Sequence, residues 1–174
     1  MLSLTEIRQF FHGTIKIGEP LAPYCTLGVG GPADYLFEVS SRQALVELTE
    51  YFVKNRFPHI VVQPTMLVSD KGFRGAAICD ANSCGTGGNS IVMFKPPMNG
   101  SIASLIEPAS VNGILWGGAK IIGNAVANVN GATASDIYAL VYHAQRVIRD
   151  NCGIDLEIDF ELIGFDQEQL ARVA

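Results

Sequence analysis

The sequence predicts an α+β protein built from two small α/β lobes. Runs rich in β-branched and aromatic residues alternate with amphipathic segments of helical period, which indicates mixed strands and helices. A stretch of small polar residues, Asn82 to Asn89, interrupts this pattern near the middle of the 174-residue chain and is typical of a linker. Hydrophobic residues make up 48% of the chain and charged residues 17%, a balance that favours a packed core over disorder. We therefore expect a first lobe over residues 1–80, a linker over 81–90 and a second lobe over 91–174.

The first lobe is expected to contain two helices and four short strands. Leu4, Ile7 and Phe10 recur at helical spacing, and a second apolar stripe follows Ser40 and Ser41, which can cap a helix. Glycine and proline mark turns between these segments. The expected elements, in order, are a helix over residues 4–11, turns over 18–23 and 28–32, a strand over 35–39, a helix over 41–54, and strands over 59–62, 66–69 and 76–79.

The second lobe carries the strongest helix signal in the chain. Ser135 and Asp136 can begin this helix, an apolar stripe runs from Ile137 to Ile148, and Gly153 occupies the position of a C-cap. Short strands punctuated by glycine precede it, and one strand follows it. The expected elements, in order, are a strand over residues 91–94, a helix over 105–109, strands over 114–116, 120–122 and 125–129, the long helix, a strand over 156–163 and a final helical turn over 167–173.

Charge and hydropathy exclude several classes of function. The 17 acidic residues outnumber the 12 basic ones, the net charge is −5, and no basic cluster is present to neutralise a phosphate backbone. No apolar run approaches the roughly 20 residues that a membrane-spanning helix needs. The N-terminal segment contains Glu6 and Arg8 and lacks the apolar core of a signal peptide. We therefore expect a cytoplasmic protein that binds neither nucleic acid nor membrane.

The four cysteines are expected to be free thiols. Only Cys79 and Cys84 are close in sequence, in a C-x4-C pair, while Cys25 and Cys152 lie far from them. A cytoplasmic chain keeps its thiols reduced, and a zinc site would need tighter pairs with histidines nearby. We therefore expect no metal site.

Two groups of motifs stand out, one in each half of the chain. The front group is Thr26-Leu-Gly-Val-Gly-Gly-Pro-Ala33 followed by Met66-Leu-Val-Ser-Asp-Lys-Gly-Phe-Arg-Gly-Ala-Ala-Ile78. The back group consists of Met93-Phe-Lys-Pro-Pro97, Trp116-Gly-Gly-Ala119, Gly131-Ala-Thr-Ala-Ser-Asp136 and Leu156-Glu-Ile-Asp-Phe-Glu-Leu-Ile-Gly164. Together these motifs resemble the UDP-N-acetylenolpyruvylglucosamine reductase family, the MurB-type flavin enzymes of peptidoglycan precursor synthesis.

The resemblance implies the scaffold of a three-domain enzyme whose second domain is not represented. In the family two domains bind FAD and a third closes over the UDP-sugar, while hydride passes from NADPH through flavin to the enolpyruvyl double bond. A domain-sized block separates the front motifs from the back motifs in the family, whereas the linker from Asp80 to Asn89 separates them here. The catalytic arginine and much of the flavin pocket belong to that block. The resemblance therefore implies that this chain is shortened and lacks reductase activity.

The front motifs also depart from the family at the FAD pyrophosphate. The family carries a Gly-Gly-Gly-Ser-Asn loop there, because glycine lets amide groups approach phosphate closely. In this chain Val61-Val-Gln-Pro-Thr65 occupies the matching place, and Pro64 has no N–H to donate. We therefore expect no bound FAD and interpret the remaining cofactor-binding positions as vestigial: Gly28, Gly30, Gly31, Ser69 and Asp70.

The proton-donating serine of the family is replaced as well. Val92 falls in its position, so we expect no catalytic residues. Two vestigial candidates remain: Ser90, about 7 Å away along the same strand face, and Asp159, which stands where the family has a glutamate. Lys95 and Lys120 are the candidates for contact with the diphosphate of a UDP-sugar.

We expect a degenerate family member that acts as a binding or interaction protein rather than as an FAD-dependent reductase. Two alternatives stay open: a sensor of nucleotide sugars of the UDP-N-acetylglucosamine type, and a UDP-N-acetylmuramate dehydrogenase that a partner chain completes. The expected partners are a second copy of the chain, another protein or a UDP-sugar. A homodimer is expected because loss of a domain exposes apolar faces that association can cover, and the segments expected in the interface are 76–79 and 91–94.

Overall fold

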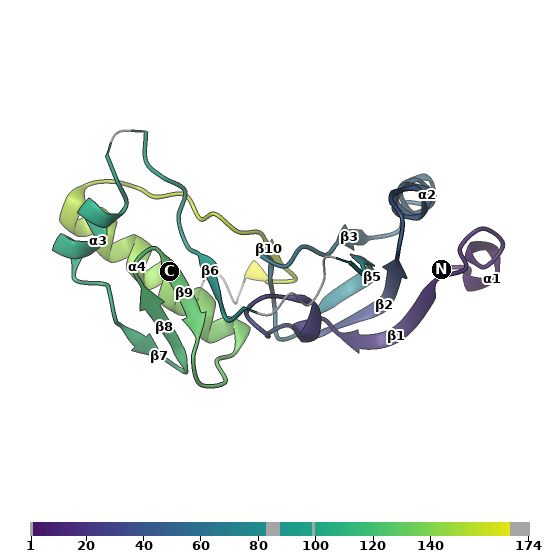
Figure 1. Ribbon diagram of the computed structural model, residues 1–174, viewed down its shortest axis with the longest axis horizontal. Helices are drawn as coiled ribbons and strands as arrows, with labels where there is room; N and C mark the ends of the chain where they lie inside the picture. The colour runs from purple at the N-terminus through teal and green to yellow at the C-terminus, as the bar shows by residue number, and fades with distance from the viewer. Residues whose placement is uncertain (1, 83–87, 99, 168–174) are drawn as a thin grey trace.

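The computed structural model describes residues 2–82, 88–98 and 100–167, which form an elongated molecule with two lobes (Figure 1). Each of these lobes contains its own four-stranded sheet and its own helices. This arrangement of mixed sheets and helices confirms the predicted α+β class. A short third sheet of two strands joins one lobe to the other.

The first lobe is a four-stranded sheet whose order is β1-β2-β5-β3. Its elements, in chain order, are α1 (Leu4–Ile7), β1 (Thr14–Pro20), the 3-10 turn η1 (Ala22–Tyr24), β2 (Pro32–Val39), α2 (Arg42–Lys54), β3 (His59–Val61), β4 (Leu67–Val68) and β5 (Phe73–Asp80). Strand β1 is antiparallel to β2, whereas β5 is parallel to both β2 and β3. The parallel arrangement of β2 and β3 follows from the crossover through α2, which returns the chain to the same end of the sheet.

Strand β5 lies at the centre of this sheet and is buried on both faces. Ala76 and Ile78 belong to the cluster packed under α2, whereas Ala77 and Cys79 belong to the cluster on the opposite face. All four side chains are fully buried. The expectation that segment 76–79 forms part of an exposed interface is therefore wrong, because β2 and β3 flank the strand and side chains cover both of its faces.

Helix α2 forms where its apolar stripe and its cap predict it. Ser41 Oγ accepts a hydrogen bond from the Ala44 amide at 3.2 Å and begins the helix. Leu48 and Phe52 are fully buried, and the ring of Phe52 packs edge-on against Phe37 of β2 at 5.3 Å between centroids. Helix α1 is shorter than expected.

Strand β1 was not expected, because its residues carry turn signals. Gly18 has a φ of +64°, and Pro20 closes the strand. Both residues are tolerated because β1 is an edge strand, where proline leaves no ladder partner unsatisfied. Lys16 fixes the strand to its neighbours: its ammonium lies 2.7 Å from the Glu38 carboxylate and donates to the Tyr24 hydroxyl at 2.8 Å. The hydrogen bond to Glu38 raises the pKa of Lys16.

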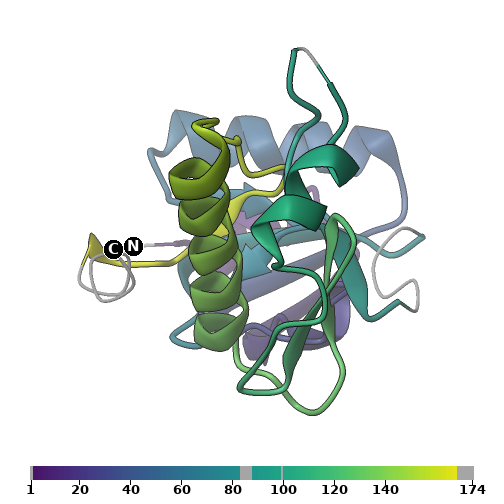
Figure 2. The same ribbon diagram turned by 90° about the vertical axis from the view of Figure 1, so that its left-hand side faces the viewer.

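The second lobe is a four-stranded antiparallel sheet with order β6-β9-β8-β7, and a long helix crosses one of its faces (Figure 2). Its elements, in chain order, are β6 (Ser90–Val92), α3 (Ala103–Ala109), β7 (Leu115–Trp116), β8 (Ala119–Ile122), β9 (Ala125–Asn128), α4 (Ala134–Cys152) and β10 (Leu162–Ile163). Ile91, Ile121 and Val126 point from the sheet into the core that it shares with α4.

Helix α4 begins at Ala134, one residue before the predicted Ser135, and has the predicted Gly153 as its C-cap. Thr133 and Asp136 form a capping box, in which each side chain accepts a hydrogen bond from the backbone of the other residue. Gly153 ends the helix in the left-handed conformation at a φ of +69°. The predicted stripe is confirmed: Val147 is partly buried, and its other members are fully buried, namely Ile137, Leu140, Val141, Ala144 and Ile148.

The segment after α4 is extended, but it is not the continuous strand expected over residues 156–163. Ile158 makes an isolated antiparallel bridge with Phe94. The segment then leaves the second lobe and forms β10, which pairs in parallel with β4 of the first lobe. The final helical turn expected over residues 167–173 lies almost entirely outside the described residues.

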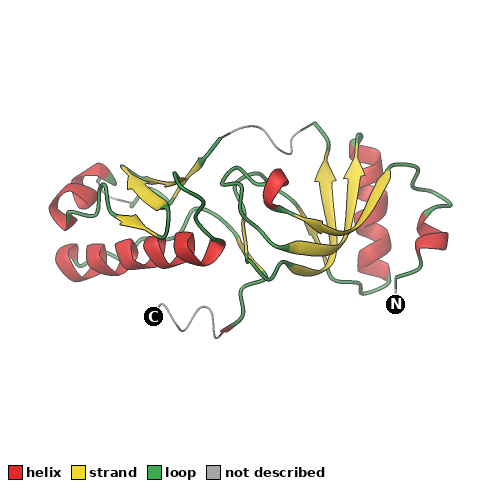
Figure 3. Ribbon diagram, turned by 90° about the horizontal axis from the view of Figure 1, so that it is seen from below, coloured by secondary structure: helices red, strands yellow, loops and turns green. Residues whose placement is uncertain are grey.

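The long helix of the second lobe points one of its ends toward the first lobe (Figure 3). Asp70 joins the two lobes through the N-terminus of α4. Its carboxylate accepts hydrogen bonds from the Ala134 amide at 2.9 Å, the Ser135 amide at 3.1 Å and the Ser135 hydroxyl at 2.8 Å. The amide of Asp136 bonds to Thr133 Oγ1, so the first three amides of the helix all have acceptors. The negative charge also lies at the positive end of the helix dipole.

Two glycines allow the backbones on either side of Asp70 to come close. A Cβ on Gly31 would collide with the carbonyl oxygen of Asp70, and a Cβ on Gly72 would collide with that of Pro32. Gly72 also has a φ of +81°, which favours glycine. A salt bridge of 2.5 Å between Lys71 and Asp166 lies beside this junction.

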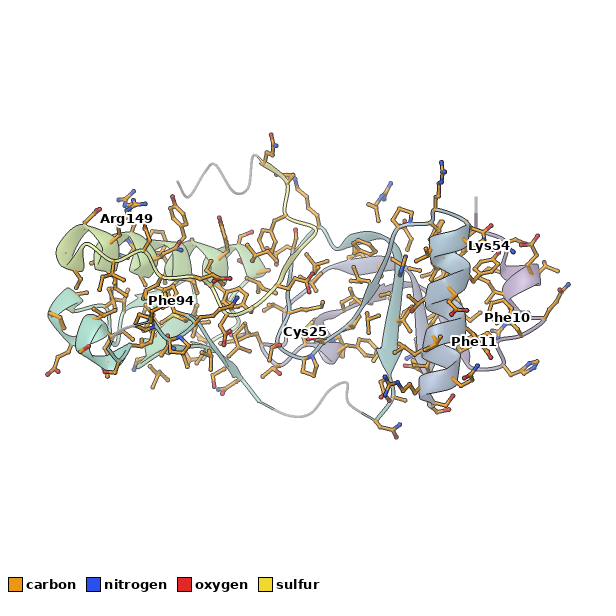
Figure 4. All side chains as sticks on the ribbon, turned by 90° about the horizontal axis from the view of Figure 1, so that it is seen from above. Phe10, Phe11, Cys25, Lys54, Phe94 and Arg149 are labelled. Carbon is orange, nitrogen blue, oxygen red and sulfur yellow. The ribbon has the colours of Figure 1, made fainter. Side chains whose placement is uncertain are left out.

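The cysteines differ from the expectation of four free thiols. Cys79 is disulfide-bonded, whereas Cys25 and Cys152 are free. Cys25 lies in the first lobe on the side facing the second (Figure 4), and its burial raises the pKa of its thiol to about 11. Within the described ranges, no group of three or more His, Cys, Asp or Glu side chains could hold a metal ion. The described helices also include none that is long and apolar enough to span a membrane.

Replacing Asp70 with alanine is expected to lower the free energy of unfolding by about 2–3 kcal/mol, because charge-assisted hydrogen bonds and a favourable helix-dipole contact are lost. Denaturant titration measures the change. Asp155→Ala is the matched control: that carboxylate is 77% exposed and lies 3.8 Å from Arg149, so its loss should change stability by less than about 0.5 kcal/mol. Equal effects of the two substitutions would contradict the bridging role of Asp70.

Candidate functional site

A shallow pocket of about 350 Å³ lies where the two lobes meet. The loop between β3 and β4 forms one wall through Gln63, Thr65 and Met66. Lys95 and the extended segment 157–161 form the other wall. The pocket therefore combines the loop that stands in place of the family's glycine-rich loop with the segment that carries Asp159.

The loop between β3 and β4 uses its own amides to form a tight turn. The Val62 amide donates to the Ile78 carbonyl at 2.8 Å, and the Met66 amide donates to the Gln63 carbonyl at 3.1 Å. The Gln63 amide donates to the Met66 sulfur at 3.3 Å. Pro64 has no amide hydrogen, and its carbonyl accepts from the Thr26 amide at 2.7 Å. Val62, Gln63 and Met66 thus have no N–H left for a phosphate.

The glycines predicted to be vestigial lie beside this loop and support the junction. The Gly28 amide donates to the Cys25 carbonyl at 3.0 Å, and the Gly31 amide donates to the Ser69 carbonyl at 2.9 Å. Gly30, with a φ of +141°, packs against Val68. Their observed contacts are therefore with the protein's own backbone and core.

Ser69 and Asp70 belong to the first lobe and form hydrogen bonds with residues of the second half of the chain. Ser69 is fully buried; its amide donates to the Ile163 carbonyl at 2.8 Å, and its carbonyl accepts from Gly31 and Gly72. Its side-chain oxygen accepts from the Lys71 amide at 3.2 Å. Asp70 caps α4, as described above. The structure thus brings the five vestigial positions together, at the junction between the lobes.

Ser90 and Lys120 lie away from the pocket entrance, on the sheet face opposite α4. Both residues pair with Ala127, so they stand in one row across β6, β9 and β8. Val92 belongs to the next row, opposite Ala125, and is 49% exposed. Only this residue of the expected interface segment 91–94 is exposed, since Ile91, Met93 and Phe94 are buried.

The outer face of this sheet is mainly apolar. The central strand β9 contributes two alanines, and its neighbours contribute larger aliphatic side chains. The exposed members, with their exposed fractions, are Val92 at 49%, Leu115 at 62% and Ile122 at 54%. Among the described strands, Lys120 is the one charged residue on this outer face.

Lys95 and Asp159 lie together on the second-lobe wall of the pocket. The Lys95 ammonium donates to the Glu157 carboxylate, and this hydrogen bond raises the pKa of Lys95. The Lys95 amide also donates to the Glu157 carbonyl, and the Asp159 amide donates to the Met93 carbonyl, both at 2.9 Å. The lysine predicted to contact a diphosphate therefore already has a carboxylate partner.

Sequence reasoning missed two further carboxylates in the pocket wall. Glu157 and Glu161 line the pocket together with Asp159. They were detectable, because residues two apart in an extended segment project to the same side. Three carboxylates and one lysine leave the lining with a net negative charge. This electrostatic environment favours a cation and disfavours a diphosphate.

Comparison with known proteins connects this site to one enzyme family. Residues 82–163 match the family described as UDP-N-acetylenolpyruvoylglucosamine reductase, C-terminal domain. The reductase of Trichlorobacter lovleyi is 33% identical over 144 residues, which cover 79% of this chain and 48% of that protein. The reductase of Bacillus subtilis is 36% identical over 75 residues, covering 41% of this chain and 25% of that protein.

A solved structure supports the same relationship at the level of the fold. The crystal structure of UDP-N-acetylenolpyruvylglucosamine reductase from Thermus caldophilus superposes with a TM-score of 0.62 at 17% identity, covering 88% of this chain and 100% of that chain. The chain spans about half the length of the Trichlorobacter relative and 25% of the Bacillus relative. In sequence the chain is thus similar to the UDP-N-acetylenolpyruvoylglucosamine reductases, residues 82–163 match their C-terminal domain, and the fold is similar to that of the Thermus enzyme.

Proposed function

We propose that this chain keeps the scaffold of the reductase family, neither holds FAD nor reduces a UDP-sugar, and acts by binding. The observation that carries the proposal is the hydrogen bonding of the loop between β3 and β4. Val62, Gln63 and Met66 donate their amide hydrogens within the protein, and Pro64 has none. This segment stands where the resemblance puts the phosphate-binding glycines.

The loss of these donors has a large effect on affinity. A hydrogen bond to a charged acceptor contributes about 1.5–3 kcal/mol. Without two such bonds, FAD affinity falls by roughly two to four orders of magnitude. Opening the turn to release its amides would break the bonds that connect it to Thr26 and Ile78. A loop of free amides that could bind phosphate therefore cannot form here without disturbing the core of the first lobe.

The environment of Val92 supports the second part of the proposal. Its aliphatic side chain stands in the position of the proton-donating serine and has no proton to give. Ser90 shares the face but lies one residue pair away, about 7 Å along the strand. General-acid assistance contributes about 10²–10⁴-fold to a rate, so its loss by itself slows turnover severely.

The charge of the pocket argues against the nucleotide-sugar sensor as the leading alternative. Lys95 is bound to Glu157, and Glu161 and Asp159 lie beside them. Lys120 lies on the outer sheet face rather than in this pocket. A diphosphate would therefore meet carboxylates where the resemblance requires cations.

The first test is cofactor retention. Protein incubated with excess FAD and passed through gel filtration is expected to show no flavin absorbance, because the loop offers too few amide donors for the pyrophosphate. Visible absorbance spectra before and after incubation measure retention. Stoichiometric flavin that stays bound through the column would contradict the proposal.

The second test is turnover. We expect no oxidation of NADPH that depends on UDP-N-acetylenolpyruvylglucosamine. The Val92→Ser variant is expected to gain no activity, since a serine alone does not restore the flavin site. The Trichlorobacter lovleyi reductase, assayed in parallel, shows that the conditions support the reaction. Turnover that Ser90→Ala abolishes would identify Ser90 as a displaced proton donor and overturn the proposal.

A further inference from the structure

Strand β6 forms one edge of the second-lobe sheet. It pairs only with β9 among the described strands, in the antiparallel register Ser90 with Ala127 and Val92 with Ala125. Ser90 and Val92 are both exposed, whereas Ile91 between them is buried. This edge is the part of the sheet closest in sequence to the linker.

The hydrogen bonds to β9 determine where the backbone groups of β6 point. The Asn128 amide donates to the Asn89 carbonyl at 2.7 Å, and the Met93 amide donates to the Asn124 carbonyl at 2.9 Å. In an antiparallel ladder, alternate residues direct both N–H and C=O to the same side. Asn89, Ile91 and Met93 therefore face β9, and the N–H and C=O of Ser90 and Val92 face outward.

This outward pattern is complementary to itself. When two β6 strands run antiparallel with Ile91 opposite Ile91 of the second copy, Ser90 lies opposite Val92. Four N–H to C=O bonds then form, related by a two-fold axis. Natural edge strands resist such pairing through charged residues, proline or bulges. Residues 90–92 contain no charge and no proline, and they pair with β9 without a bulge.

We propose that two copies of this chain join through β6 and form one continuous eight-stranded sheet across a two-fold axis at Ile91. The inference rests on the proposed function, since it names the partner through which the chain acts by binding. Ser90 and Val92 supply the outward backbone groups of this contact. The joined sheet brings the two outer apolar faces side by side.

The strand is short, so the contact is expected to be weak. Three residues from each copy bury less than roughly 1,200 Å² in total. Interfaces below that size are typical of weak or transient complexes. We therefore expect a reversible dimer with a dissociation constant in the micromolar range. Its mass in sedimentation equilibrium should approach twice the 18.7 kDa of one chain as concentration rises.

Val92→Pro is the decisive variant. Proline removes the outward N–H of Val92 in each copy, which deletes two of the four intermolecular bonds, yet breaks no bond to β9. We expect the dissociation constant to rise about tenfold or more. Ile122→Lys is the matched control: it lies on the outer face but off the edge, so the dimer should persist in it.

Hydrogen exchange provides a second measurement that needs no variant. The Ser90 and Val92 amides should gain protection as concentration rises, while the Ile91 amide, which bonds to β9, should not change. A wild-type chain that stays monomeric up to near-millimolar concentration overturns the inference. So does a dimer that Ile122→Lys dissociates and Val92→Pro leaves intact, since that result indicates packing of the outer faces.

These outcomes separate the inference from the proposed function. A flavin-free monomer would overturn only the β6 dimer, because the chain could still bind another partner. A chain that retains flavin would overturn the proposed function, whatever its mass. Both measurements use the full chain.

Discussion

The carboxylate of Asp70 connects the first lobe to the N-terminus of helix α4 in the second lobe. It binds the first amides of a helix that begins 64 residues later, at the end where the helix dipole favours a negative charge. Strand β10 reinforces the contact by returning to pair with β4. Gly31 and Gly72 leave room for the backbones that surround Asp70. Together these contacts bring the β3–β4 loop against segment 157–161 and so create the pocket between the lobes.

The same contacts limit what the pocket can bind. Gly31 donates to the Ser69 carbonyl, Ser69 donates to the returning strand, and the Gly28 amide donates to the Cys25 carbonyl. An amide that already donates within the protein can bind phosphate only if that bond is broken, and such an exchange brings little net free energy. The opposite wall carries three carboxylates, one of which holds Lys95. Local structure and charge therefore agree in opposing an anionic cofactor at this place.

The two faces of the second-lobe sheet have different roles. Helix α4 covers the inner face, and buried Ile91, Ile121 and Val126 contribute to the core. The outer face exposes Val92, Leu115 and Ile122, although an aliphatic side chain gains free energy when it leaves water. Clustered exposed apolar residues of this kind mark surfaces of interaction. These exposed side chains agree with the binding role proposed for the chain.

The sequence by itself determined the elements whose signals are local. The apolar stripe, Ser135 and Asp136 at the start and Gly153 at the end predict α4 almost to the residue, because caps and helical periodicity involve neighbours in the chain. The family motifs indicate candidate positions, of which Lys95 and Asp159 line the pocket and Lys120 does not. Tertiary structure alone decided the rest. Strand β1 contains turn residues that are acceptable only at a sheet edge, and segment 76–79 is buried because β2 and β3 flank it. Asp70, read as a vestigial cofactor contact, became the cap of a distant helix because packing brings together residues that no local pattern relates.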